Sequence, residues 1–318
     1  MRNDSIYKIV FTLLICALFW IIGYYNEVGL PLSDYGFSLL WKKICKIFNI
    51  EKTTLYLFGF FLLCLGAALL QWFNFIFVII KEKTVMPFLL FLLLNSTNSN
   101  LYPLRPISFI LFLLIISMFE LYSFQKNQNT IGRMFNITFY LCVGSLMWPH
   151  VLLFIPVFWI GMYQLRVLNM RSMGASLLGI FTVVLYALGW CSWIKNLDVF
   201  KEIFQSIADI NLIFFDEMWL IKWFVPLCIF LSMFLVTFVK NEYIIHAQKS
   251  ILFILTFGFF SFILTLFYAN YVSDFLCVFY IPASIILSFS FSGKRTIFKS
   301  LLYYFFVFFL LSTGMAFE

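Results

Sequence analysis

The segment 251–270 reads ILFILTFGFFSFILTLFYAN and contains no charged residue. As an α-helix, about 20 residues extend roughly 30 Å, which is the thickness of the hydrocarbon core of a bilayer. Only helices and closed barrels satisfy their backbone groups in that core, and this run lacks the alternation of a barrel strand. The segment therefore predicts a transmembrane helix.

Similar apolar runs recur along the whole chain. We expect about eleven of them, within a range of ten to twelve: 9–26, 55–75, 85–98, 107–124, 135–148, 151–165, 173–193, 218–239, 251–270, 275–292 and 300–317. Segment 85–98 is short for a span, and 55–80 could form one long tilted helix. Segment 135–165 could be one broken helix, but Pro149 starts a helix well and disrupts one badly, so two spans are preferred.

The composition excludes a soluble protein. Of 318 residues, 64% are hydrophobic and only 11% are charged, against about 25% charged in soluble domains. The expected fold is all-α, a polytopic transmembrane helical bundle that forms a single membrane domain over 1–318. Two halves, 1–193 and 218–318, could be joined by an outer amphipathic segment 194–217.

The basic residues predict the orientation. With the N-terminus inside, the short inner segments hold 13 of the 21 lysines and arginines, and the outer segments hold most of the acids. This asymmetry follows the positive-inside rule and predicts a cytoplasmic N-terminus in a bacterial inner membrane. The net charge of +7 is explained in this way, so nucleic acid is not expected as a partner.

Two of the outer segments are amphipathic. In 35–49 the apolar residues recur every three to four positions, with lysines on the other face, and 196–213 shows a similar stripe. Both predict helices that lie in the membrane interface. They either cap the bundle or form a roof over a cleft that lipid can reach.

Several kinds of chemistry are excluded. The seven cysteines form no CxxC pair, and the two histidines, His150 and His246, are far apart in sequence. We therefore expect no metal and no cofactor. Glu120 is the one acid well within a span, and it is interpreted either as a paired carboxylate near Lys126 or as a proton relay.

The polar residues gather at the outer face. Glu27 and Asp34 follow the first span, Arg105 lies in the loop NSTNSNLYPLRP, His150 lies in the next outer turn, and Lys222 lies near the eighth span. Carboxylates act as general bases, and arginine binds phosphate through two nitrogens. These residue types would serve a reaction on a lipid-phosphate sugar. The alternative is that loops are polar because they face water.

One stretch carries a family resemblance. The segments 81–123 and 134–189 resemble a family of uncharacterised polytopic inner-membrane proteins of Gram-negative bacteria, over about a third of the chain. The matching residues are Glu82, Thr84, Pro87, Pro103, Gly144, Ser145, Leu146, Pro149, Arg166, Arg171 and Gly179. The basic turn of the family has a different sequence, so the chain would be a divergent member of it. The resemblance implies no activity.

More distantly, the chain is similar to the GT-C-fold glycosyltransferases that use polyprenyl-phosphate sugars. In that family the first outer loop holds a catalytic acid followed by a membrane-parallel helix, and here Asp34 precedes 35–49. The resemblance implies that Asp34 is the catalytic carboxylate, with Glu27 as a second candidate. It also implies that Arg105, His150 and Lys222 bind the lipid phosphate. Asp34 could instead only cap the helix.

Three functions remain open. The first is a GT-C-like glycosyltransferase, or a relative, that acts on a polyprenyl-linked sugar at the outer leaflet. The second is a non-enzymatic membrane subunit of a cell-envelope assembly, because the acid pair typical of GT-C loops is absent. The third is a transporter of a lipid-linked substrate. The expected partners are membrane lipids, including polyprenyl-phosphate sugar in the first case, and other membrane proteins in the second.

Overall fold

The computed structural model describes residues 2–26, 41, 51–80, 84–97, 102–124, 130–193, 203, 205–210, 226–233 and 245–291. Over these ranges the protein consists of helices and their connections, without a β-strand. Five of the helices are long and apolar enough to cross a membrane: Tyr7–Tyr25, Lys52–Phe77, Pro106–Ser123, Met170–Trp193 and Ala269–Phe289. The all-α membrane fold is confirmed at this level, and the count of eleven spans stays a prediction.

The main helices follow the predicted apolar runs. Their bounds are α1 Arg2–Tyr25, α3 Lys52–Phe77, α4 Met86–Ser96, α5 Pro106–Ser123, α6 Thr130–Ser145, α7 Ile155–Gln164, α8 Met170–Trp193, α11 Ile245–Phe267 and α12 Val272–Phe291. Two short 3₁₀ helices, η3 (Pro149–Phe154) and η4 (Ala269–Tyr271), precede α7 and α12. Helix α3 is a single helix that ends at Val78, whose φ of 46° is left-handed and stops the helix.

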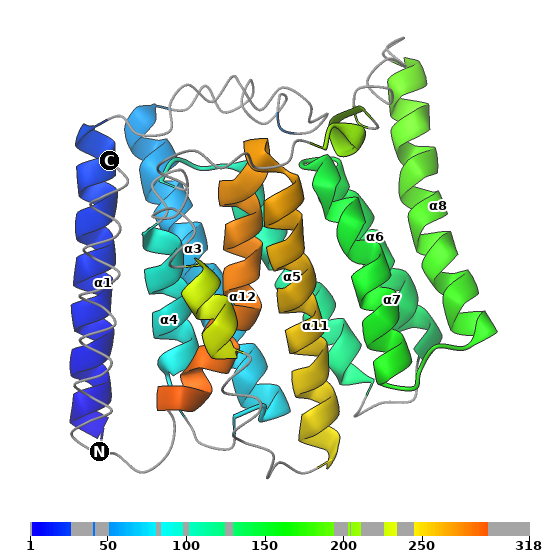
Figure 1. Ribbon diagram of the computed structural model, residues 1–318. Coiled ribbons are helices and arrows are strands. Elements are labelled where there is room, and N and C mark those ends of the chain that lie inside the picture. Colours follow the sequence, from blue (N-terminus) through cyan, green and yellow to red (C-terminus); the bar gives the residue numbers. More distant parts are fainter. Residues whose placement is uncertain are drawn as a thin grey trace.

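The helices stand side by side in one bundle (Figure 1). Helix α1 lies at one flank and α8 at the other, while α11 and α12 stand between them. The N-terminus marks the lower end in this view, and α11 and α12 are joined through η4 at the opposite end. We call this opposite end the upper end.

Helix α4 lies at the centre of the bundle. Its residues 89–94 are all almost completely buried, and it packs against α12, α3 and α1. A helix that is apolar on every side has no polar face to turn to water, so it belongs inside other helices. Its 11 residues reach only about 16 Å, too short to cross a bilayer alone, in agreement with the doubt about 85–98.

The break predicted within 135–165 is confirmed. Helix α6 ends at Ser145, and η3 starts at Pro149 after the extended residue Trp148. Proline at the first position of a helix loses no backbone bond, and its fixed φ suits a helix start. The chain therefore reverses at Trp148, so that α6 and α7 are separate helices with a tight turn between them.

Small residues bring α8 against α6. The buried face of α8 contains Ser172, Ala175, Ser176 and Gly179, spaced so that two pairs lie four residues apart. Thr138 Oγ1 of α6 donates a hydrogen bond to the Ser176 carbonyl at 2.8 Å. Close helix contact through small residues, with a hydroxyl bonded across the interface, is typical of helix pairs in membranes.

Glu120 is a paired carboxylate. It accepts hydrogen bonds from Arg133 and Asn136 of α6, both at 3.3 Å. Its partners therefore come from the next helix, whereas the expected partner Lys126 lies outside the described residues. The pairing favours a structural role over a proton relay, because the charge is already balanced at the lower end of α5.

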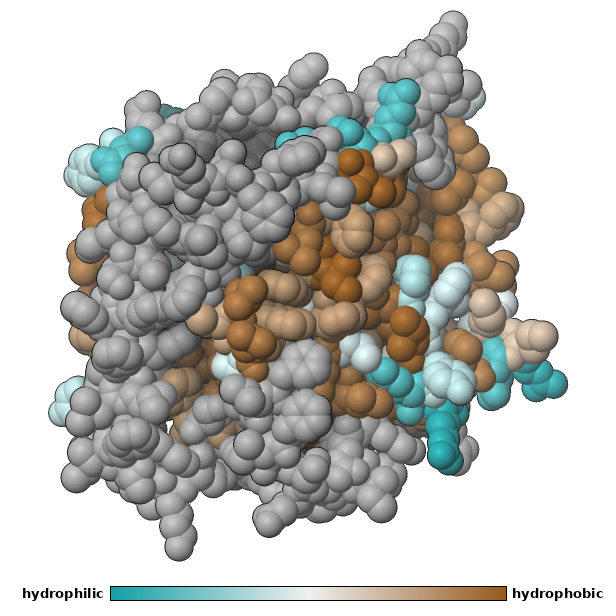
Figure 2. Space-filling model, viewed as in Figure 1, coloured by the Kyte–Doolittle hydropathy of each residue, from teal (hydrophilic) through white to brown (hydrophobic). Residues whose placement is uncertain are grey.

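The space-filling view has the pattern expected of a membrane protein. Among the coloured residues, apolar side chains spread over the centre and right of the visible face, and hydrophilic groups lie at the upper edge and towards the lower right (Figure 2). A lipid-facing belt between polar ends is what a bilayer requires.

Some predictions fall on other parts of the chain. The span 300–317 and the helix 35–49, apart from the buried Trp41, lie outside the described residues. Of the predicted span 218–239, only 226–233 is described, and it is helical. Of 196–213, residue 203 and residues 205–210 are described, with helical geometry at 205–208.

Candidate functional site

Arg105 is held in front of α5 by its neighbour in sequence. Its backbone is extended, with φ −127° and ψ 161°, and Pro106 begins the helix. A proline disfavours helical geometry in the residue before it, so the guanidinium is carried just beyond the helix start. Arg105 is only 6% exposed. An arginine is rarely buried to this degree unless it is paired.

Asp274 provides the opposite charge. It lies in the first turn of α12 and is 5% exposed, and its charge interacts with that of Arg105. The position also suits a carboxylate, since the amino end of a helix carries a partial positive charge. Asp274 is not among the site residues expected from the sequence. The one feature of the sequence that could have pointed to it is its position directly before the apolar run 275–292.

His150 is buried in the turn between α6 and α7, ahead of the apolar segment 151–165, and is 1% exposed. Its Nε2 lies 3.2 Å from the carbonyl oxygen of Ser206. Because a carbonyl can only accept, Nε2 must carry the proton. Burial lowers the pKa of His150 from its ordinary 6.5 to about 4, so the ring is neutral near pH 7.

Aromatic side chains surround the imidazole. Ring centroids lie 4.3 Å away for Tyr271, 5.1 Å for Tyr268, 5.2 Å for Trp148 and 5.8 Å for Phe275. Tyr268 also donates its hydroxyl to the carbonyl of Ile207 at 2.6 Å. The position of the His150 ring is therefore fixed by packing against these four aromatic side chains.

Tyr271 connects the histidine to the charged pair. Its ring is the nearest to His150, and its hydroxyl feels the charges of both Asp274 and Asp209. Arg105, Asp274, Tyr271 and His150 thus form a chain of neighbours at the upper end. We call these four residues, with Trp148 and Tyr268, the upper-end cluster.

Hydrogen-bond donors dominate the cluster. The donors are the His150 Nε2–H, the Tyr268 hydroxyl, the Arg105 guanidinium and the Trp148 indole, whose Nε1–H has no acceptor among the described residues. The acceptors include the Asp274 side chain, on which the charge of Arg105 acts, and His150 Nδ1, which has no partner among the described residues. A group rich in acceptor oxygens, such as a phosphate, complements this set.

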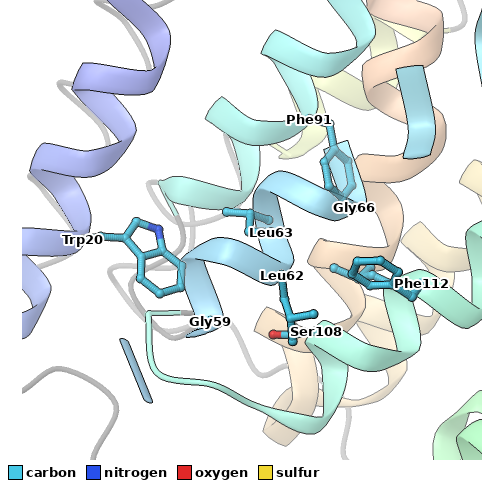
Figure 3. A pocket seen from close by; sticks show the side chains of 9 residues that line it. Trp20, Gly59, Leu62, Leu63, Gly66, Phe91, Ser108 and Phe112 are labelled. Atoms are coloured by element: carbon cyan, nitrogen blue, oxygen red, sulfur yellow. The ribbon is translucent and has the colours of Figure 1, made fainter. Parts of the chain in front are cut away.

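The side chains of the cluster are buried, and a small pocket lies in another part of the described residues. A pocket between α1, α3, α4 and α5 is lined by Trp20, Gly59, Leu62, Leu63, Gly66, Phe91, Ser108, Leu111 and Phe112 (Figure 3). Its lining is apolar and its cavity volume is about 10 Å³, room for about one water molecule. It does not hold a sugar or a phosphate as it stands.

The structure thus brings together two of the five predicted site residues, Arg105 and His150, at one end of the bundle. Asp34, Glu27 and Lys222 lie outside the described residues. Over the described part of the chain, no group of three or more His, Cys, Asp or Glu side chains could hold a metal ion. The residues that sequence reasoning missed are Asp274, Tyr268 and Tyr271.

Comparison with known proteins yields no relative. No family model, no curated protein and no solved structure matches the chain.

Proposed function

We propose that this membrane protein is a GT-C-like glycosyltransferase that acts on a polyprenyl-linked sugar at the outer leaflet of a bacterial inner membrane. The observation that carries the proposal is the upper-end cluster, where several buried hydrogen-bond donors lie at one end of an apolar bundle. A lipid-linked phosphate places its charge at the membrane surface and its chain in the bilayer, so its two parts match the cluster and the apolar helices.

In this proposal each residue has a stated role. Arg105 binds the phosphate through two guanidinium nitrogens, and His150 donates its Nε2–H to another phosphate oxygen. Asp34 is the general base, or the charge stabiliser, for the acceptor that attacks the anomeric carbon of the sugar. The bond from that carbon to the phosphate oxygen breaks, and the polyprenyl phosphate leaves. Lys222 and Glu27 are further candidates.

The charges of the described residues support an outer position for this site. Near the helix ends that form the lower end, namely the starts of α1, α6 and α8 and the ends of α5 and α7 (Figure 1), the described side chains include four bases and one acid: Lys8, Arg133, Arg166, Arg171 and Glu120. The upper end holds two bases, Lys52 and Arg105, and three acids, Glu51, Asp209 and Asp274. The positive-inside rule therefore favours a cytoplasmic lower end.

The test is transfer in proteoliposomes that contain polyprenyl-phosphate sugar. We expect Asp34→Asn to lower the transfer rate by about 10²–10⁴, the usual contribution of a general base. Arg105→Lys keeps the charge beside Asp274 but loses the bidentate geometry, so we expect weaker lipid binding by about tenfold. Arg171→Gln, an exposed base at the lower end, is the matched control. Wild-type rates in Asp34→Asn and Arg105→Lys would refute the proposal.

A second candidate is a non-enzymatic membrane subunit. The observation that favours it is the closed cluster, since Arg105, His150 and Asp274 are all less than a tenth exposed. Groups that are paired and covered also serve simply to fix helix ends. Under this function, neither the wild type nor Asp34→Asn catalyses transfer in the proteoliposomes, and the wild-type protein binds no polyprenyl phosphate.

A further inference from the structure

The segment 205–210 lies directly on the donors of the upper-end cluster. Two successive carbonyls of this segment accept hydrogen bonds, Ser206 from His150 at 3.2 Å and Ile207 from Tyr268 at 2.6 Å. Neither donor comes from a neighbouring part of the sequence, since each bond joins residues more than 50 positions apart. The segment is therefore held onto the bundle from two different elements.

A peptide carbonyl offers the same chemistry as a phosphate oxygen, because both are acceptors. The Ser206 and Ile207 carbonyls thus occupy the donors that a lipid phosphate would need. We propose that the segment formed by residues 203 and 205–210 is an autoinhibitory cover, which imitates the ligand with its own carbonyls and must lift before a lipid phosphate enters. This inference rests on the function proposed above.

The burial pattern of the cover agrees with this role. Ile203 and Ser206 share one face of the helical turn and are both buried, while Ala208 and Ile210 are exposed. Ser206 also donates its hydroxyl to the Ile203 carbonyl at 2.8 Å, which keeps the turn compact. One side of the segment is turned to the bundle, and Ala208 and Ile210 are exposed on the other.

The charge of Asp209 gives a second reason why a phosphate cannot bind while the cover is closed. Asp209 of the segment acts on Tyr271, so a negative charge stands beside the cluster while the cover is closed. A phosphate would be repelled by it at short range. Lifting the segment removes this charge and releases the two donors in the same movement.

Two other donors of the cluster belong to the bundle and would stay in place when the segment lifts. Trp148 keeps its indole Nε1–H, which has no acceptor among the described residues, and Arg105 stays beside Asp274. The open site would then offer His150, Tyr268, Trp148 and Arg105 to one anionic group, with Asp274 balancing part of the positive charge.

The test uses the full chain in detergent micelles, with farnesyl phosphate as the probe. Ile203→Ala removes buried contact from the cover without touching a donor, and Ile210→Ala, at a side chain 55% exposed, is its matched control. Because the apparent affinity scales with the open fraction, we expect Ile203→Ala to bind at least about tenfold more tightly than wild type. Ile210→Ala should bind as wild type does.

Two further measurements keep the outcomes distinct. Hydrogen exchange over 205–210 should become faster in Ile203→Ala and in Tyr268→Phe, which removes the hydroxyl donor but keeps the ring. Farnesol and inorganic phosphate should bind far more weakly than farnesyl phosphate, as expected for a lipid phosphate and not for either part alone.

Equal affinity of wild type and Ile203→Ala, together with faster exchange in the variant, overturns the cover and leaves the proposed function standing. Exchange as slow in both variants as in wild type also overturns the cover. If neither wild type nor Ile203→Ala binds farnesyl phosphate while exchange does become faster, the proposed function fails, and the ligand role of the cover fails with it.

Discussion

At the scale of single residues, His150 illustrates how burial sets chemistry. Its Nε2–H is fixed by the Ser206 carbonyl, and four aromatic rings hold its plane. The same burial that fixes the ring disfavours its charged form. A neutral, oriented donor is therefore available near pH 7, without the cost of a buried imidazolium.

This burial predicts a pH dependence of stability. The pKa of His150 is about 4 in the folded protein, against 6.5 ordinarily. Between these values the unfolded state binds more protons, so stability falls as the pH falls through that window, by up to about 3 kcal/mol. We expect the thermal midpoint in detergent to drop from pH 7 to pH 4.5 in wild type. His150→Gln should drop clearly less, and an equal drop in both would contradict the pKa shift.

At the scale of elements, the contact between α6 and α8 depends on Gly179. A Cβ at this position would meet the Thr138 side chain and the backbone of α6. Residues at a close helix crossing have no room to grow, because the main chain cannot yield as a flexible side chain does. Gly189, on the same helix, has no atom within 4 Å of such a Cβ.

Substitution of these two glycines separates packing from helix propensity. We expect Gly179→Leu to lower the free energy of unfolding by about 1–3 kcal/mol or more, the usual cost of overpacking. Gly189→Leu should be neutral or slightly stabilising, since leucine is the better helix former. Thermal unfolding of both variants in detergent checks this. If Gly179→Leu were no less stable than Gly189→Leu, the described α6–α8 contact would be wrong.

Some elements were predictable from sequence because their cause is local. The apolar runs gave the helices, and Pro149 gave the break between α6 and α7, since a proline restricts its own backbone and that of its neighbour. The sequence predicted that 85–98 is short for a span, and α4 has only 11 residues. Its central position depends on which helices surround it, and no periodicity in 86–96 contains that information.

The candidate site was predictable only in part, because it is assembled from distant segments. Arg105 and His150 stood out as polar residues beside apolar runs. The electrostatic interaction between Arg105 and Asp274 joins positions far apart in sequence, and the contact of His150 with Ser206 depends on how 205–210 folds back. The helix predicted for 196–213, as a cap of the bundle or as a roof over a cleft, does not specify these partner atoms, because an amphipathic stripe contains no information about them.

At the scale of the whole molecule, the protein is a helical bundle whose upper end is rich in hydrogen-bond donors and whose lower end is basic. The apolar helices hold the cluster at one end of the bundle, and the carbonyls of Ser206 and Ile207 lie against its donors. The orientation then decides which leaflet supplies the lipid. The charge difference between the two ends predicts a cytoplasmic lower end.

Orientation is tested by reporter fusions after residues 249 and 193. Lys249 lies near the start of α11, at the lower end, and Trp193 ends α8, at the upper end. We expect the fusion at 249 to report a cytoplasmic position and the fusion at 193 an external one. Reports from the same side would contradict the arrangement of α8 and α11, and exchanged sides would contradict the proposed leaflet.

The most direct test of the central claim is to map where a polyprenyl phosphate touches the protein. A photoreactive polyprenyl phosphate, with its diazirine next to the phosphate, is irradiated with the full chain in detergent, and the labelled peptides are identified by mass spectrometry. The account predicts labelling of peptides that contain Arg105, His150 and Tyr268, reduced in Arg105→Lys and by excess unlabelled lipid phosphate. Labelling that is confined to the lower end or to α8, and unchanged in Arg105→Lys, would contradict it.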